Sequence, residues 1–164
     1  MGTPFTQVYN RFLGKITDDM YMELTPEDTV RDLRNLLIDA IPGFEFPRVN
    51  LLDYTIIEAE NALEEESSFA ADLSSEEVNI LAILMMVGWT QRQITSIENT
   101  RMKYSSSDFK FTSQANHLAK LLTLLTEVQR QSHHMQRLYK RRKTDANGVY
   151  ESNWSVLRDT SALN

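Results

Sequence analysis

The chain has 164 residues, of which 41% are hydrophobic and 24% are charged, and its formal net charge is −6. This length favours one domain with its own apolar core. The absence of cysteine excludes disulfides, thiolate metal sites and cysteine nucleophiles, and it leaves the cellular compartment open. The longest apolar run, residues 80–87, is well short of the ~20 residues that span a bilayer, and the first residues lack the pattern of a signal peptide. We therefore expect no membrane contact.

The charge is divided unequally between the two halves of the chain. Residues 1–80 hold 17 Asp/Glu against 5 Lys/Arg, a net charge of −12, and residues 81–164 hold 6 against 12, a net charge of +6. Either the two halves neutralise each other within one molecule, or an acidic face of one copy meets a basic face of the next, as in a head-to-tail ring. The sequence leaves both interpretations open.

Two helices are predicted in the first quarter of the chain. The first begins at Thr3-Pro4, with Thr3 as the N-cap, and its apolar stripe includes Phe5, Val8 and Phe12. The second begins at Thr25-Pro26 with early acids that suit the helix dipole, and Pro42-Gly43 ends it. The buried positions predicted for the second helix are Val30, Leu33, Leu37 and Ile41.

Residues 44–73 are the least regular part of the sequence. Apolar stretches at 49–57 and 69–73 flank an acidic segment with five glutamates, which is typical of an exposed loop. We predict a short β-hairpin here, beside the helices.

The clearest helix start is Ser74-Ser75-Glu76-Glu77, in which Ser74 and Glu77 form a capping box. The residues from Val78 to Trp89 are apolar on nearly every side, which predicts the central buried helix, and Gly88 could let another helix approach closely.

A long final helix is predicted from Ser113, as its cap, to about Lys143. Its apolar stripe thins to Gln, Ser and His after Val128, so we expect this second half to project from the core. The helix ends in Lys140, Arg141, Arg142 and Lys143. These side chains are either a favourable helix C-terminus or contacts for phosphate and channel DNA.

An extended C-terminal tail, residues 145–164, follows a helical domain of residues 1–144 in our prediction. It is polar except for a few apolar residues, among which Trp154 stands out. Exposed aromatic residues on tails often anchor to partners, although Trp154 could also pack on its own domain. We take Val149, Trp154, Leu157 and Arg158 as interface candidates.

The sequence carries no recognisable catalytic motif, and we expect no catalytic, cofactor-binding or metal-binding residues. There is no phosphate-binding glycine loop, nucleophile elbow or metal helix. The histidines His117, His133 and His134 all fall on the final helix at spacings that do not chelate one metal, so solvated or interfacial positions are expected for them.

Two stretches of the chain resemble a known family. The first is PFTQVYNRFLGKITDD at residues 4–19; the second comprises LSSEEVNIL at 73–81, Trp89, DFKF at 108–111 and SQANHL at 113–118. Together they resemble the head–tail connector, or neck, proteins of tailed bacteriophages.

The resemblance implies a structural virion protein, mainly α-helical and not an enzyme. Such proteins form a ring, typically dodecameric, beneath the portal protein, where they extend the DNA channel and provide a docking surface for tail or neck proteins. The resemblance thus implies a location in the virion neck, and in the host cytoplasm during assembly. The alternative from the residues alone is a small helical nucleic-acid-binding or regulatory protein that uses the basic run 140–143.

Overall fold

The structure, a computed structural model, describes residues 2–16, 21, 24–57, 66–103, 111–144 and 150–152. This part of the chain is mainly helical, as the sequence predicts. Its elements are α1 (Phe5–Leu13), α3 (Pro26–Ala40), the 3-10 turn η1 (Ile41–Gly43), β1 (Tyr54–Thr55), β2 (Ser68–Phe69), α4 (Ser75–Lys103), α5 (Phe111–Arg141), β3 (Arg142–Thr144) and β4 (Tyr150–Ser152).

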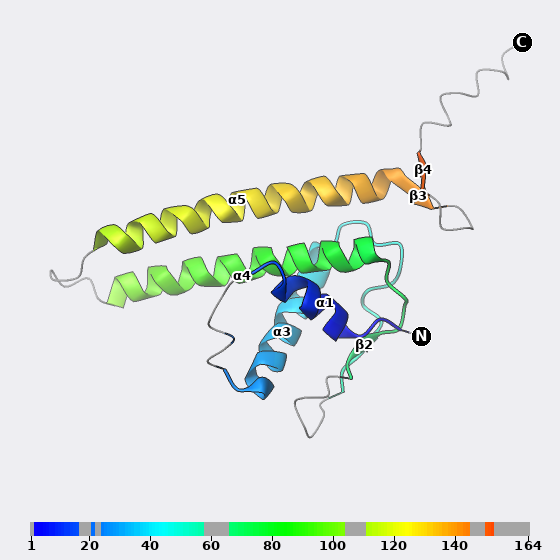
Figure 1. Cartoon of the computed structure of the whole chain (residues 1–164), viewed down its shortest axis with the longest axis horizontal. Coiled ribbons are helices and arrows are strands. Elements are labelled where there is room, and N and C mark those ends of the chain that lie inside the picture. The colour runs from blue at the N-terminus through cyan, green and yellow to red at the C-terminus, as the bar shows by residue number, and fades with distance from the viewer. Residues whose placement is uncertain are drawn as a thin grey trace, which may run out of the picture.

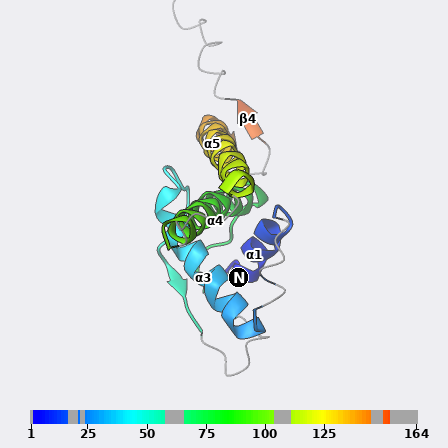
Figure 2. The same cartoon turned by 90° about the vertical axis from the view of Figure 1, so that its left-hand side faces the viewer.

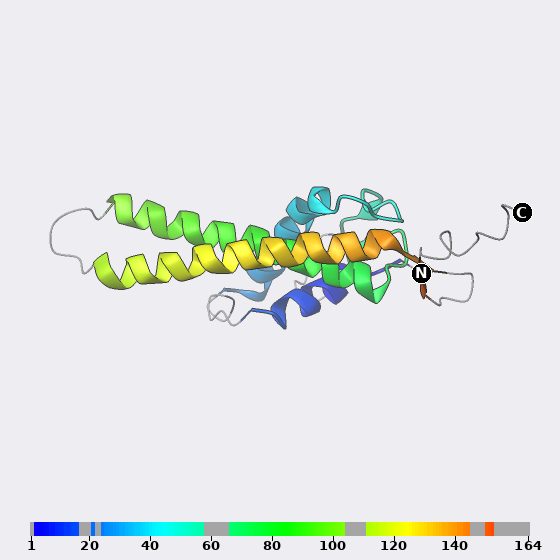
Figure 3. The same cartoon turned by 90° about the horizontal axis from the view of Figure 1, so that it is seen from above.

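The two longest helices, α4 and α5, lie side by side and antiparallel (Figures 1 and 3). Helices α1 and α3 pack against α4 on the side opposite to α5, as the end-on view shows (Figure 2). They cover only the part of α4 near its N-terminus. The C-terminal end of α4 and the N-terminal part of α5 extend together beyond the core as an arm (Figure 1).

Helix α1 has the predicted buried stripe, but its start is different from the prediction. Phe5, Val8 and Phe12 are fully buried. The N-cap residue is Pro4, and no side chain caps the helix. Thr3 is instead buried and accepts a hydrogen bond from the Leu73 N–H at 2.7 Å. Its hydroxyl therefore ties the start of the chain to the segment that precedes α4.

Helix α3 begins as predicted, because the Thr25 hydroxyl accepts a hydrogen bond from the Asp28 N–H at 3.2 Å. Of its predicted apolar face, Leu33, Leu37 and Ile41 are buried, and the chain turns at η1.

The short hairpin expected within residues 44–73 is present. Strands β1 and β2 pair antiparallel, with Tyr54 opposite Phe69. The rings of Tyr54 and Phe69 both pack against Phe5 of α1, with centroid distances of 5.8 and 4.7 Å. The hairpin thus closes one end of the core.

The capping box at the start of α4 is confirmed. Glu77 Oε2 accepts a hydrogen bond from the Ser74 N–H at 2.7 Å, and Ser74 Oγ accepts one from the Glu77 N–H at 3.3 Å. Ile80, Leu81 and Met85 are fully buried, as expected for the central helix.

The prediction for α5 is wrong in two respects. Ser113 lies inside the helix, which begins at Phe111. The half after Val128 does not project: Val128, Ser132, Gln136 and Tyr139 are buried. The projecting half is the first, where Leu122 and Leu124 are exposed. Ser132 and Gln136 were misleading because their side chains are buried and form hydrogen bonds within the fold.

The end of α5 also differs from the prediction. The helix ends at Arg141, and residues 142–144 form β3, which pairs antiparallel with β4. The first described part of the predicted tail, Tyr150–Ser152, is therefore a strand that folds back on β3. Residues 145–149 and 153–164 lie outside the described part of the chain.

We expect Leu81→Ala to lower the free energy of unfolding by about 2–5 kcal/mol, because it removes a fully buried side chain from the core. Leu84→Ala is the matched control and should cost less, because Leu84 is only partly buried. Urea denaturation measures both. Equal losses of unfolding free energy for the two variants would contradict the deeper burial of Leu81.

Candidate functional site

The predicted basic run lies at the junction of α5 and β3, where two of its members have partners within the chain. The Lys140 ammonium lies 3.8 Å from the centre of the Phe46 ring. Arg142 Nη1 lies 2.9 Å from Glu76 Oε1, whose side chain is only 7% exposed. Arg141 is exposed, and Lys143 lies on β3. Lys140 and Arg142 thus attach the end of α5 to the rest of the domain.

A buried carboxylate lies beneath this junction. Glu77 Oε1 accepts a hydrogen bond from the Tyr139 hydroxyl, while Glu77 Oε2 accepts from Ser74. The Tyr139 hydroxyl accepts in turn from the Arg48 N–H at 3.2 Å. The Arg48 guanidinium lies 4.3 Å from the centre of the Tyr139 ring and donates to the Tyr139 carbonyl at 2.7 Å. Burial, together with the hydrogen bond to Glu77, raises the pKa of Tyr139 far above its ordinary value.

Gln136 makes a second polar attachment one turn earlier. Its Oε1 accepts a hydrogen bond from the Glu45 N–H at 2.7 Å, and its Nε2 donates to the Gly43 carbonyl and to Ser132 Oγ, each at 3.2 Å. The loop after α3 is therefore held by α5, although 91 residues separate Glu45 from Gln136.

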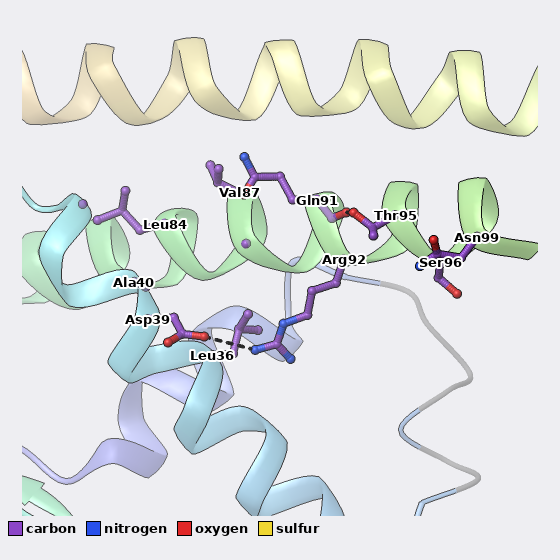
Figure 4. A pocket seen from close by; sticks show the side chains of 12 residues that line it. Leu36, Asp39, Ala40, Leu84, Val87, Gln91, Arg92, Thr95, Ser96 and Asn99 are labelled. Carbon is purple, nitrogen blue, oxygen red and sulfur yellow. Dashed lines mark hydrogen bonds and ion pairs between the residues drawn. The ribbon is translucent and has the colours of Figure 1, made fainter.

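A groove of about 820 Å³ lies between α3 and α4 (Figure 4). Its lining includes an apolar part with Leu36 and Ala40 of α3 and Leu84, Val87 and Gly88 of α4. Its polar rim is formed by Asp39, Gln91, Arg92, Thr95, Ser96 and Asn99. A Cβ atom at Gly88 would lie 3.2 Å from Leu36 Cδ1, so glycine permits the close approach of α3 that the sequence suggested.

Arg92 is the charged residue of α4 at this rim. Its Nη1 lies 2.7 Å from Asp32 Oδ1, whereas its Nη2 lies 3.6 Å from Asp39 Oδ2. The Asp39 side chain is 74% exposed, against 30% for Asp32. Asp32 therefore holds the guanidinium, and the Asp39 carboxylate remains accessible to solvent.

The other predicted site residues are placed as follows. Val149, Trp154, Leu157 and Arg158 lie outside the described residues. His117, His133 and His134 are exposed, as expected, and His133 Nδ1 lies 3.6 Å from Glu45 Oε1. The described residues contain no group of three His, Asp or Glu side chains placed to hold a metal ion. Within the same part of the chain, no helix combines the length and apolarity needed to cross a membrane.

Sequence reasoning missed the groove and its ion pairs. Gly88 was the available indication of close packing, and Asp32 and Asp39, seven residues apart on one helix, share a face. The pattern of α4 does not identify the helix that approaches it.

Comparisons of the chain with known protein families, with characterised proteins and with solved structures found no match.

We expect the Tyr139 hydroxyl to make folding stability depend on pH in alkaline solution. Because the folded-state pKa is raised above the ordinary value of 10.0, the contribution is complete below pH 10.0 and falls as pH rises, since only the unfolded chain releases the proton. Above that pH the wild type should lose about 1.4 kcal/mol per pH unit relative to Tyr139→Phe. Urea titrations at a series of pH values from neutral upward measure the difference. If the free energies of unfolding of the two proteins depended on pH in the same way, the buried hydrogen bond would be contradicted.

A comparison of Arg142→Ala with Arg141→Ala tests which of the two arginines stabilises the fold. We expect Arg142→Ala to reduce stability by about 1–2 kcal/mol, because it leaves the largely buried Glu76 carboxylate without its cation. Arg141→Ala should leave the unfolding curve unchanged, since the side chain is exposed. The opposite order of stabilities would show that Arg142 has no structural role.

Proposed function

We propose that this chain is a structural subunit of a tailed bacteriophage neck: a head–tail connector that assembles in the host cytoplasm as a ring, which is dodecameric in the virion. In this proposal the ring lies beneath the portal protein, extends the DNA channel and joins the head to tail or neck proteins. The chain acts through its surfaces and performs no catalysis.

The first support is the resemblance of residues 4–19 and of the segments between 73 and 118 to this family. The mainly helical fold agrees with what that resemblance implies.

The observation that carries the proposal is the placement of charge on opposite sides of α4. Among residues 115–141 of α5, five Lys or Arg side chains are exposed, against the single acid Glu127. Helix α3, on the other side of α4, carries four acids against two arginines. Unlike charges on opposite sides favour a head-to-tail contact between copies, and such a contact closes into a ring when the rotation between copies permits.

The arm offers apolar side chains for the proposed contact between copies. Leu121 is buried, whereas Leu122 and Leu124 are exposed at 48% and 37%. An arm that extends beyond its own core can lie along the core of the adjacent copy and bury such side chains there.

We expect the purified protein, alone or mixed with its portal protein, to form closed rings in negative-stain electron microscopy. Raising the salt from about 0.05 to 0.5 M should reduce the ring fraction in light scattering, because the exposed charges are then screened. Arg137→Glu on the exposed side of α5 should do the same at low salt, and Glu127→Lys is the matched control that adds positive charge to the same helix.

Two outcomes would overturn the proposal. A protein that remains monomeric with and without the portal protein would exclude a ring. A dimer that binds free DNA with strongly salt-dependent affinity would support the nucleic-acid-binding alternative, with the exposed Arg141 as the first residue to test.

A further inference from the structure

The α3–α4 groove has the character of a site for a short amphipathic segment. The half-buried side chains of Leu84 and Val87 offer apolar surface beside the buried Leu36, and the Asp39 carboxylate lies at the rim, 74% exposed (Figure 4). A groove that combines apolar and charged surface can receive one face of an amphipathic helix. The C-terminal segment of the chain itself has the chemistry that such a groove requires.

The last twelve residues of the chain, 153–164, follow β4 and have matching chemistry in their sequence. Trp154 and Leu157 are three positions apart and Arg158 follows, so a helical turn would place the two apolar side chains on one face beside the cation. The apolar pair suits the lining of the groove, and the Arg158 guanidinium suits the Asp39 carboxylate. Trp154 comes two residues after Ser152, the last residue of β4, so the chain between them reaches only about 7 Å.

The position of β4 favours a groove on another copy. Strand β4 pairs with β3 at the end of α5, where Arg142 contacts Glu76 near the start of α4. Arg92 lies sixteen residues further along α4, about 24 Å away, and α5 is on the opposite side of α4 from α3 (Figures 1 and 2). In a head-to-tail arrangement the α5 side of one copy faces the α3 side of the next, which brings β4 of the first copy toward the groove of the second.

We propose that residues 153–164 of one copy dock in the α3–α4 groove of the adjacent copy, with Trp154 and Leu157 on its apolar lining and Arg158 paired with Asp39. This proposal rests on the head-to-tail assembly proposed above.

The absence of cysteine allows a direct test on the full-length chain. Thr95→Cys places a thiol at the groove, and Ser155→Cys places one beside Trp154. When the two variants, carrying tags of different mass, are mixed at low salt and oxidised, we expect a disulfide-linked heterodimer. Lys120→Cys, exposed on α5, is the control for the groove position and should give at least tenfold less heterodimer with Ser155→Cys.

A charge exchange tests the rim contact. In the cysteine-bearing chains, Asp39→Arg or Arg158→Asp alone should reduce the heterodimer yield about fivefold or more, since each places like charges together. Asp39→Arg in the groove chain combined with Arg158→Asp in the tail chain should restore the yield. Failure of the pair to restore it would remove Asp39 as the partner of Arg158.

The outcomes separate this proposal from the function. Rings without the 95–155 disulfide would overturn docking in the groove and leave the connector function standing. Linked dimers without rings, alone or with the portal protein, would support the docking and overturn the ring. A disulfide within one chain, when Thr95→Cys and Ser155→Cys are combined in a single molecule diluted with unlabelled wild type, would show that the segment occupies its own groove and would overturn the proposal.

Discussion

The Glu77 carboxylate determines how α4 and α5 are held together. A carboxylate that is 4% exposed is stable in a protein only when hydrogen-bond donors replace its water, and here Ser74 and Tyr139 supply them. Because Ser74 precedes α4 and Tyr139 lies in the last turn of α5, this one group aligns the two ends. The helices have 29 and 31 residues, so aligning them at one end makes their other ends extend together beyond the small core. The arm is therefore a consequence of the attachment at the junction.

The elements that could be predicted from sequence are those whose determining residues lie close together in the chain. The capping box at Ser74 and Glu77 and the cap at Thr25 depend on residues three positions apart, so the pattern contains all that is needed. The apolar stripe of α1 and the apolar run of α4 likewise predicted which residues are buried in the core. The short hairpin followed from two apolar stretches that flank an acidic segment.

The errors arose where the partner is distant in sequence. Ser132 and Gln136 read as solvent-facing residues, but Gln136 bonds to Gly43 and Glu45, and no periodicity in α5 indicates a loop 91 residues away. Thr3 read as a helix cap for the same reason, because its actual partner is the Leu73 N–H. At the candidate site, the attachment of Lys140 to Phe46 and of Arg142 to Glu76 could not be read from the sequence.

Charge alone is a weak basis for assembly between copies of this chain. Exposed ion pairs contribute about 0–1 kcal/mol each and are screened by salt, so the basic side of α5 and the acids of α3 can orient two copies without holding them. A durable contact requires apolar burial, and the described surface offers it at the exposed leucines of the arm and in the lining of the groove. The groove differs from the arm in one respect: Asp39 at its rim sets the charge of the partner, and Arg158 in the C-terminal segment supplies the opposite one. In the proposed assembly, the charged surfaces would therefore orient two copies, and burial of the Trp154 side chain would hold them together.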